Sequence, residues 1–393
     1  MPADIRLLSI APYRFLPPST GGHWAIAGLH EALGRQCEDV LISTQSNQPA
    51  KENSFRLYPI LPDKASRYLP FAHFPEVKKI AQQTGCTHLL IEHPYMAPLA
   101  WRLSKSLKLP WYIRSHNIES ERFRSLGKKW WPILRQYEQW AMRAANGIFF
   151  ITPEEKEWAL KNYGLSENRC HVAPFGTNLT APPLRDNANA KLARNLGVSP
   201  DVPWLYFLGI LDYAPNEEAV AFILNEIAPR LKAAGSEARI FIAGKNLNPA
   251  LQAQIKATGG QVHYLGFVED LSLFINACDV MLNPVLRGGG IKTKAVEALA
   301  YNKMVVSTQS GAEGLLPDVC APNLLLAENG NWAAYFEQLR IALHSQPGIG
   351  AAFYAHYSWE SIAGKVLDVM SASNEARRAA GMVAAAGLVE KGL

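Results

Sequence analysis

Short apolar runs alternate with longer amphipathic segments along most of the chain, which is the pattern of a parallel sheet with helices on its faces. In the first half of the chain this alternation predicts strands at residues 5–11, 40–43, 88–92, 111–115, 147–151 and 170–174, and helices at 22–33 and 133–145. The order of these elements indicates a doubly wound α/β unit.

Residues 178–203 interrupt the pattern because they are rich in Pro, Asn and Ala, as a linker is. The pattern then restarts, with strands predicted at 204–209, 238–243, 262–265, 280–283 and 304–307 and helices at 217–231 and 292–301. A chain of 393 residues is too long for one ordinary core. We therefore expect two Rossmann-like doubly wound domains, residues 1–180 and 181–359, that face a central cleft. Ligands of such sheets bind beyond the carboxyl ends of the strands.

A glycine loop after the strand at 280–283 has the features of an anion site. Glycines let a ligand approach the backbone, and the helix that follows presents free N–H groups and the positive end of its dipole. Three cations accompany the three glycines, so the loop matches a diphosphate in charge. These residues are Arg287, Gly288, Gly289, Gly290, Lys292 and Lys294.

Glu297 is a single carboxylate in the otherwise apolar stretch 295–300. Burial of an unpaired carboxylate is costly. Two interpretations account for it: Glu297 accepts hydrogen bonds from the vicinal hydroxyls of a ribose, or it pairs with Lys292 or Lys294 on its own helix.

The first half of the chain contains a similar loop between its first strand and first helix. Ser19 or Thr20 is placed to cap that helix, while Gly21 and Gly22 expose backbone N–H groups to an anion.

Histidines follow two later strands of the first half. His116 and Asn117 come directly after the strand at 111–115, where they either reach a ligand or cap the next helix. His88 and His93 bracket Glu92 at a spacing that matches no zinc motif, and residues five apart on a strand face opposite sides. We expect His88 to be structural and His93, at the end of its strand, to contact an acceptor.

Composition and charge narrow the class of protein. A hydrophobic content of 48% with 19% charged residues excludes disordered and fibrous chains. Residues 1–180 contain 22 Lys and Arg against 15 Asp and Glu, a net charge of +7, whereas the remainder contains 17 against 19, a net charge of −2. A basic first half indicates an anionic acceptor or surface on that side, or only a basic solvated face.

The cysteines and the termini suggest a cytoplasmic protein. Five scattered cysteines without C-x-x-C spacing indicate reduced thiols and exclude a zinc framework. The N-terminus lacks a secretory pattern, and no window approaches the roughly 20 apolar residues of a membrane-spanning helix.

The segment 122–143 interleaves basic residues with tryptophans. This combination suits peripheral contact with an anionic membrane at its inner face, or a lipid-linked acceptor. The other interpretation is a packed helix whose tryptophans belong to the core. Nothing like a nucleic-acid-binding module surrounds the segment, so we expect no nucleic-acid partner. The residues are Arg122, Arg124, Lys128, Lys129, Trp130, Trp131, Arg135 and Trp140.

Eight segments, in order along the chain, resemble the retaining GT-B glycosyltransferases of the family-4 type. They are PPSTGG at 17–22, RSHN at 114–117, WAMRAANG at 140–147, VAPFGTN at 172–178, FLGILDYAPN at 207–216, LGFV at 265–268, the glycine, lysine and glutamate helix at 288–300, and YSW at 357–359. The resemblance covers nearly the whole chain. It implies the GT-B fold, with the chain returning to the first domain over about 360–393.

The activity that the resemblance implies is that of a hexosyltransferase of polysaccharide biosynthesis. Such an enzyme moves a sugar from a nucleotide-diphosphate-sugar to a glycan or lipid-linked acceptor with retention, and it needs no cofactor besides this co-substrate. Gly21 and Gly22 would abut the donor phosphates, and His116 would lie near the transferred sugar. The backbone at Phe267 and Val268 would hold the base.

In the second domain the resemblance assigns the ribose hydroxyls to Glu297 and the leaving diphosphate to a set of cations. The cations are Arg287, Lys292 and Lys294. The sequence departs from the family at Gly289, where a Glu that contacts the donor sugar is usual, and at residues 212–216, which lack the usual Lys. We infer that this positive charge has moved to Arg287 and Lys292. Because the chain also lacks an Asp-x-Asp pair, we expect transfer without a metal.

Two other functions stay open. A non-hydrolysing nucleotide-sugar epimerase would bind the same kind of ligand between two such domains, and a non-catalytic nucleotide-binding partner subunit would explain Gly289. The chain contains no Gly-x-Ser-x-Gly elbow, no Walker loop and no Gly-x-Gly-x-x-Gly after a strand, which argues against hydrolases, P-loop enzymes and dinucleotide-dependent dehydrogenases.

Overall fold

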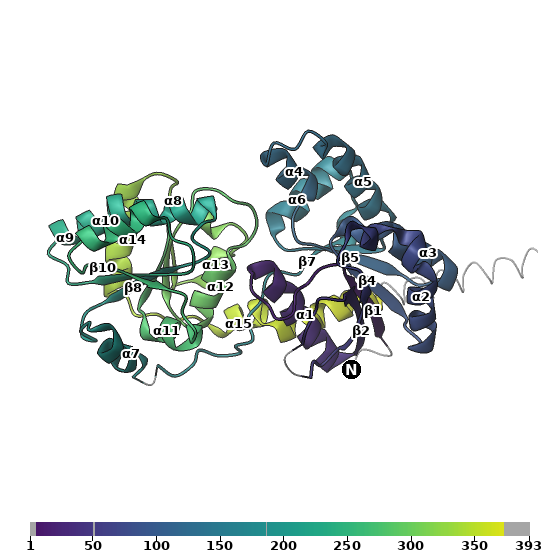
Figure 1. Ribbon diagram of the computed structural model, residues 1–393, viewed down its shortest axis with the longest axis horizontal. Coiled ribbons are helices and arrows are strands. Elements are labelled where there is room, and N and C mark those ends of the chain that lie inside the picture. Colours follow the sequence, from purple (N-terminus) through teal and green to yellow (C-terminus); the bar gives the residue numbers. More distant parts are fainter. Residues whose placement is uncertain (1–4, 50–51, 186, 373–393) are drawn as a thin grey trace, which may run out of the picture. The chain divides into compact units, whose positions relative to one another are not determined.

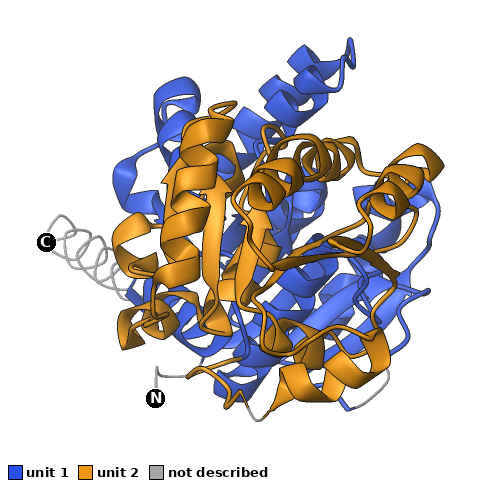
Figure 2. Cartoon of the chain, turned by 90° about the vertical axis from the view of Figure 1, so that its left-hand side faces the viewer, with its two compact units in different colours: residues 1–178, 359–393 blue, residues 179–358 orange. Residues whose placement is uncertain are grey.

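The computed structural model describes residues 5–49, 52–185 and 187–372, which form two compact units (Figure 2). Unit 1 comprises residues 1–178 and 359–393, and unit 2 comprises residues 179–358. Residues 359–372 are helical and belong to unit 1. The remainder of the segment expected to return to the first domain, 373–393, lies outside the described residues.

Unit 1 is built on a parallel sheet with the order β3-β2-β1-β4-β5-β6-β7 (Figure 1). Its strands are β1 (Arg6–Ala11), β2 (Glu38–Thr44), β3 (Arg56–Leu61), β4 (His88–Glu92), β5 (Trp111–Ser115), β6 (Gly147–Phe150) and β7 (Cys170–Val172). All six strands predicted in this half are present. The prediction missed β3, which lies at the edge of the sheet and contains Pro59. Proline lacks the N–H of a central strand and is confined to such edges.

Helices connect the strands of unit 1 as parallel pairing requires. They are α1 (Gly21–Gln36), α2 (Pro70–Gln83), α3 (Ala97–Leu107), α4 (Glu119–Ser125), α5 (Trp131–Ala144) and α6 (Pro153–Tyr163), with short turns at η1 (Ala65–Tyr68), η2 (Pro94–Met96) and η3 (Glu167–Arg169). Trp130, which precedes the first residue of α5, is 47% exposed, and Trp140, within α5, is 40% exposed. These two side chains are not core, so the interpretation of the segment 122–143 as a packed helix with core tryptophans is wrong for them.

Unit 2 repeats the architecture with the strand order β10-β9-β8-β11-β12-β13. The strands are β8 (Trp204–Leu208), β9 (Arg239–Ala243), β10 (Val262–Gly266), β11 (Val280–Asn283), β12 (Met304–Thr308) and β13 (Leu324–Ala327). Every strand pair in both sheets is parallel. The predicted fold class of two Rossmann-like doubly wound domains is therefore confirmed, and β13 is the strand missed in this half.

The helices of unit 2 include one in the segment predicted as a linker. They are α7 (Ala188–Leu196), α8 (Ala214–Phe222), the π-helical turn η4 (Ile223–Ile227), α9 (Ala228–Ala233), α10 (Pro249–Ala257), α11 (Leu271–Ala277), α12 (Thr293–Ala300), η5 (Ser310–Ala312), α13 (Pro317–Cys320), α14 (Trp332–His344) and α15 (Ala351–Tyr357). The linker prediction for 178–203 is wrong over α7, which packs on α11. No helix in the described ranges is both long and apolar enough to cross a membrane.

Trp359 attaches the helix at 359–372 to the rest of unit 1. Its backbone N–H donates a hydrogen bond to the carbonyl of Thr177 at 2.9 Å, and the centroid of its ring lies 5.3 Å from the centroid of the Phe175 ring. A Cβ added at Gly28 of α1 would lie 2.3 Å from Nε1 of Trp359, so only glycine leaves room for the indole. The segments VAPFGTN and YSW therefore meet at one contact.

We predict that Gly28→Ala destabilises the protein by about 1–3 kcal/mol, because the buried indole must move, although alanine is the better helix former. Gly364→Ala is the matched control. Its new Cβ would lie 3.5 Å from Oε1 of Gln36, an ordinary contact, and the loss of glycine entropy should raise stability by up to about 1 kcal/mol. Urea unfolding followed by circular dichroism measures both effects. Equal stability changes in the two variants would show that Trp359 does not constrain position 28.

Candidate active site

The predicted site residues follow the carboxyl ends of strands in both sheets. In unit 1 the strand order reverses at β1, between β2 and β4, and in unit 2 it reverses at β8, between β9 and β11. Loops that leave neighbouring strands diverge at such a point and form a crevice at the carboxyl edge of the sheet. The candidate residues follow β1, β4 and β5 in unit 1, and β10 and β11 in unit 2.

The loop between β1 and α1 exposes backbone N–H groups. Thr20 is the N-cap of α1, and its hydroxyl accepts a hydrogen bond from the N–H of His23 at 3.4 Å. Gly21 and Gly22 are the first helical residues, whose N–H groups have no carbonyl one turn earlier. A Cβ at Gly22 would meet no atom within 4 Å. Space and unpaired donors at a helix start suit an anionic group.

His116 lies just beyond β5 and is held by a carboxylate from the neighbouring strand. Its Nε2 forms a short hydrogen bond with Oε2 of Glu92, the last residue of β4. Its ring stacks on that of His93, with 4.1 Å between the centroids and 16° between the planes. His93 has a φ of 66°, a left-handed value that is unusual for a residue with a side chain. Backbone strain of this kind is concentrated at functional sites.

The helix α4 is capped from elsewhere, so the alternative capping role of His116 and Asn117 is wrong. The N–H groups of Glu119 and Ser120 donate to the carboxylate of Glu138, on α5, at 2.8 and 3.1 Å. Asn117 instead donates its side-chain amide to Oε1 of Glu119 at 3.3 Å.

Behind His116 a chain of buried charged groups crosses four elements, α1, β2, β4 and β5. His30, on α1, contacts Oδ2 of Asp39 at 2.6 Å through Nδ1 and Oε1 of Glu92 at 3.1 Å through Nε2. Arg114, on β5, lies 3.6 Å from Oε2 of Glu92. None of the side chains of His30, Asp39, Glu92 and Arg114 is exposed. Each buried carboxylate thus has a cationic partner, as burial of charge requires.

The electrostatics of this cluster fix its protonation. Burial alone would lower the pKa of His30, but Asp39 and Glu92 outweigh it and raise the pKa to about 9. Burial also opposes ionisation of Glu92, yet Arg114 and the two histidines hold its pKa well below the usual value. Burial lowers the pKa of His116 to about 3, and His93 adds to this effect. The His116 ring is therefore neutral at pH 7, and its bond to an ionised Glu92 requires the proton on Nε2.

The stability of the folded state follows from these directions. The contribution of His30 is fully present below the unfolded pKa of about 6.5 and is lost as the pH rises through about 9. The contribution of neutral His116 has the opposite sign, since it is present above about 6.5 and is lost as the pH falls toward 3.

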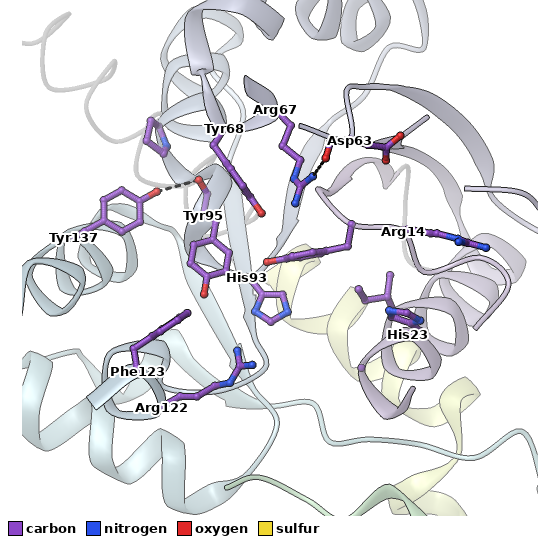
Figure 3. A pocket seen from close by; sticks show the side chains of 14 residues that line it. Arg14, His23, Asp63, Arg67, Tyr68, His93, Tyr95, Arg122, Phe123 and Tyr137 are labelled. Carbon is purple, nitrogen blue, oxygen red and sulfur yellow. Dashed lines mark hydrogen bonds between the residues drawn. The ribbon is translucent and has the colours of Figure 1, made fainter. Parts of the chain in front are cut away.

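A pocket of about 920 Å³ opens beside His93 in unit 1 (Figure 3). Its walls come from the loops after β1, β3 and β4, the start of α1, and α4 and α5. The lining combines three arginines and two histidines with aromatic rings and a single carboxylate. The residues are Tyr13, Arg14, Gly22, His23, Ile26, Asp63, Arg67, Tyr68, His93, Tyr95, Pro98, Arg122, Phe123 and Tyr137. His93 was the residue assigned to an acceptor contact, and the structure places it in this wall.

In unit 2 the loop between β11 and α12 is shaped by two of its three glycines. Gly288 and Gly290 have φ values of 101° and 72°, which only glycine adopts readily. Gly289 has no such φ, and a Cβ there would meet no atom within 4 Å, so neither conformation nor space demands glycine. Lys292 folds back on the loop and donates Nζ to the carbonyls of Gly288 and Gly290, both at 2.6 Å.

The other two predicted cations have different surroundings. Nζ of Lys294 donates to Oδ1 of Asn216, after β8, at 3.0 Å and lies 3.8 Å from the centroid of the Phe207 ring. Burial lowers the pKa of Lys294 well below its usual range. The guanidinium of Arg287 is mostly exposed and forms two hydrogen bonds with Glu218, one of them at 2.8 Å from Nε. The amide of Asn216 thus joins the loop after β8 to the helix after β11.

Glu297 is largely enclosed on α12, and burial raises its pKa to about 7. No ion pair joins it to Lys292 or Lys294 within the described chain, so the interpretation of a pair on its own helix is wrong. Phe267 follows β10 and is 62% exposed, with Nζ of Lys245 over its ring at 4.2 Å, and Val268 is half-buried. An exposed aromatic ring of this kind has a free face for a planar base.

Sequence reasoning missed the charged cluster around Glu92. Glu92 and Arg114 occupy strands that are otherwise apolar, HLLIE and WYIRS, and His30 lies on the buried face of α1. A charge inside an apolar strand was the available signal, because such a residue is buried and requires a partner. The partners are 9 to 62 positions apart in sequence, so the pattern alone did not pair them.

Comparison with known proteins gives the chain a family context. Residues 20–181 match the model of Glycosyltransferase Family 4, and residues 202–345 match that of Glycosyl transferases group 1. An uncharacterised 44.6 kDa protein from the cps region of Klebsiella pneumoniae is 27% identical over 114 residues, which cover 28% of this chain and only 29% of that protein.

Two solved structures show the same fold over their full length. A glycosyltransferase from Rickettsia africae matches with a TM-score of 0.72 and 12% identity, over 94% of this chain and 99% of its own. Anabaena Alr3699/HepE in complex with UDP matches with a TM-score of 0.67 and 15% identity, over 94% of this chain and 100% of its own. At these identities the likeness concerns the fold.

We predict that Glu92→Gln lowers the free energy of unfolding at pH 7 by about 3–5 kcal/mol, because it leaves His30 and Arg114 buried with too little negative charge. Glu360→Gln is the control, since Glu360 is 50% exposed and pairs with Arg35 at 3.2 Å. Loss of such a surface pair should cost about 0.2–1 kcal/mol. Urea unfolding measures the free energy of unfolding of both variants. A small and equal decrease in both would contradict the proposed role of Glu92 in balancing the buried charges.

Proposed function

Since the chain is a glycosyltransferase with the GT-B fold, we propose that it transfers a sugar from a nucleotide-diphosphate-sugar to a glycan or lipid-linked acceptor. The proposed transfer retains the anomeric configuration and needs neither a metal nor another cofactor.

One observation carries the donor assignment: the loop between β11 and α12 combines glycine backbone and cations, and the helix that follows holds a carboxylate without an ion pair among the described residues. Gly288 and Gly290 set the loop conformation, and Lys292 donates hydrogen bonds to two carbonyls of that loop and lies 3.9 Å from the carboxylate of Glu313. A diphosphate could take these bonds in exchange. Fixed cations stabilise negative charge as it develops on a leaving diphosphate, which is commonly the largest catalytic contribution. We propose Lys292, Lys294 and Arg287 for this role in place of a metal.

Glu297 and Phe267 complete the proposed donor site. A carboxylate whose pKa burial raises to about 7 is satisfied when two ribose hydroxyls donate to it. Anabaena Alr3699/HepE has been solved with UDP and with UDP-glucose, so a uridine diphosphate sugar is the first donor to test here.

His116 is proposed to act at the transferred sugar, with Gly21 and Gly22 at the donor phosphates. Glu92 fixes the Nε2–H tautomer of His116, which leaves Nδ1 as a neutral hydrogen-bond acceptor. A neutral ring does not repel the oxocarbenium-like state through which a glycosyl group passes. Asn117 is proposed as an acceptor contact next to it.

The experiment measures thermal stability with a panel of nucleoside diphosphates and then turnover of the matching sugars. We predict that one base stabilises the protein best, since a ligand at 100 times its Kd adds about 2.7 kcal/mol to the free energy of unfolding. We also expect NMR of the product to show the anomeric configuration of the donor.

Glu297→Ala should abolish the stabilisation by nucleotide. Because ribose hydroxyls favour the ionised carboxylate, nucleotide binding at pH 6 should release a proton, and binding should tighten as the pH rises through about 7.

The outcomes separate the other candidates. Conversion of the donor sugar without any acceptor would indicate the epimerase, and nucleotide binding without turnover of any donor would indicate the non-catalytic subunit, for which Gly289 is the supporting observation. Inversion at the anomeric carbon would contradict the retaining assignment alone.

We also propose that unit 1 contacts an anionic membrane surface through the segment 122–143. Leu126, Trp130 and Ile133 are 58%, 47% and 73% exposed, and Lys128 and Lys129 lie between them. Exposed apolar side chains interleaved with lysines fit the interface of an anionic bilayer.

We predict that the protein sediments with vesicles that contain anionic phospholipid and less with neutral ones, and that Ile133→Glu weakens this binding roughly tenfold. Ile341→Glu is the control, because Ile341 is 43% exposed on α14 of unit 2. Equal binding of both variants would refute the assignment of the segment 122–143.

A further inference from the structure

The pocket beside His93 carries positive charge that its own walls do not balance. Its lining contains three guanidinium groups and one carboxylate, that of Asp63. The charge of Arg122 is neutralised by an ion pair with Glu119, whose Oε2 lies 3.1 Å from Nη1 of Arg122. Asp63 forms no ion pair within the described chain, and its Oδ1 accepts a hydrogen bond from Ser46 at 2.5 Å. Arg14 and Arg67 therefore have no carboxylate partner among residues 5–49, 52–185 and 187–372.

Arg67 is held in place but is not satisfied. Its Nη1 donates to the carbonyl of Asp63 at 2.7 Å, and its guanidinium carbon lies 4.9 Å from the centroid of the Tyr68 ring. Its Nε is buried and has no hydrogen-bond partner among the described residues. Figure 3 shows the guanidinium directed into the pocket, on the side of His93 opposite to Arg122. A buried donor without a protein partner requires one from a ligand or an ordered water.

A second buried donor lies in the same wall. The hydroxyl of Tyr13 is buried and forms no hydrogen bond with described residues. The ring of Tyr13 lies 5.1 Å from that of His93, and Tyr68, Tyr95 and Arg67 are close enough to influence its ionisation. Burial, with Tyr68 and Tyr95, raises the pKa of Tyr13, so the hydroxyl keeps its proton and can donate it.

Arg14 supplies the remaining charge from the loop after β1. It is exposed and forms no hydrogen bond or ion pair with described residues. Burial and the charge of Arg14 lower the pKa of His23, so His23 adds a neutral ring at this end of the pocket. Two arginines and a tyrosine thus line one cavity, and arginine binds phosphate and carboxylate through paired hydrogen bonds.

The pocket also adjoins the proposed reaction centre. His93 lines it and stacks on His116 at 4.1 Å. A molecule that fills the pocket would lie against the histidine pair, where an acceptor hydroxyl is required. The aromatic lining offers flat apolar surfaces with hydroxyl groups at their edges, which suits a sugar ring.

We propose that the acceptor is an anionic saccharide, a sugar that carries a phosphate or carboxylate group, and that Arg67 and Arg14 bind this group in the pocket beside His93. The inference rests on the proposed function, because it names the acceptor class of the same reaction. Tyr13 donates a further hydrogen bond to the anionic group, and Arg122 remains paired with Glu119.

The test measures binding of glucose, glucose 6-phosphate, glucuronate and farnesyl phosphate to the full-length protein by calorimetry. The nucleoside diphosphate that stabilises the protein most is present at saturation to occupy the donor site; if none stabilises it, the titrations are run without nucleotide. We predict that an anionic probe binds at least tenfold more tightly than glucose, and that Arg67→Gln and Arg14→Gln each remove about tenfold of this affinity. Arg56→Gln, which removes an exposed arginine of β3 outside the lining, should leave it unchanged.

Each outcome decides the proposal. Tighter binding of glucose 6-phosphate or glucuronate would identify a soluble or glycan-borne anion. Tighter binding of farnesyl phosphate would assign the anion to a lipid carrier. Either result supports an anionic acceptor if Arg67→Gln weakens the binding of that probe. Equal binding of glucose and the anionic probes would overturn it, as would anion binding that is the same in Arg67→Gln and Arg14→Gln. Arg67→Lys, which keeps the charge but loses the paired geometry, should bind with intermediate affinity. Nucleotide stabilisation of every variant shows that the fold and the donor site are intact, so a failure of this inference is distinct from a failure of the proposed function.

Discussion

The carboxylate of Glu92 imposes the constraint on which the architecture of unit 1 depends. Its side chain is fully buried at the end of β4, and a carboxylate in such a place persists only with cationic and hydrogen-bonding partners around it. Those partners are His30 from α1, Arg114 from β5 and His116 from the loop after β5. Neutralising one charge therefore ties three elements together where the strand order reverses, and it also sets the position and tautomer of His116.

Unit 2 treats charge in the opposite way. Among the described residues, Lys294 is enclosed with an amide and an aromatic ring as partners and Glu297 is enclosed without a cation, so burial moves the pKa values of both toward the neutral form. Uncompensated groups of this kind cost free energy in the absence of a ligand. Their presence beside the glycine loop is understandable if a ligand supplies the missing partners. The balanced cluster of unit 1 is thus a scaffold, whereas the unbalanced groups of unit 2 fit a binding site.

The same distinction separates the two faces of the histidine pair. Toward the interior, His116 meets Glu92, whose charge is balanced. Toward the pocket, His93 meets a lining in which Arg67 and Tyr13 have buried donors without partners in the part of the chain that the structure describes. In the proposed reaction, the charge-balanced side positions His116, and the unsatisfied side is available for the acceptor. Preorganisation of this kind limits the reorganisation that a reaction requires.

The sequence by itself determined the α/β class, eleven strands and the glycine loop, because hydrophobic period, glycine and helix-start signals are local. It missed the edge strands β3 and β13 and most of the connecting helices, among them α2, α3, α6, α10 and α14, and it assigned the segment of α7 to a linker, since the buried residues of α7 are Ala188 and Ala193. Only the tertiary structure decided which charges meet. The partners of Glu92 are up to 62 positions away from it in the sequence, and the walls of the pocket come from segments more than 100 positions apart. A buried charge interacts with the groups that are near it in space, and no local sequence pattern records that distance.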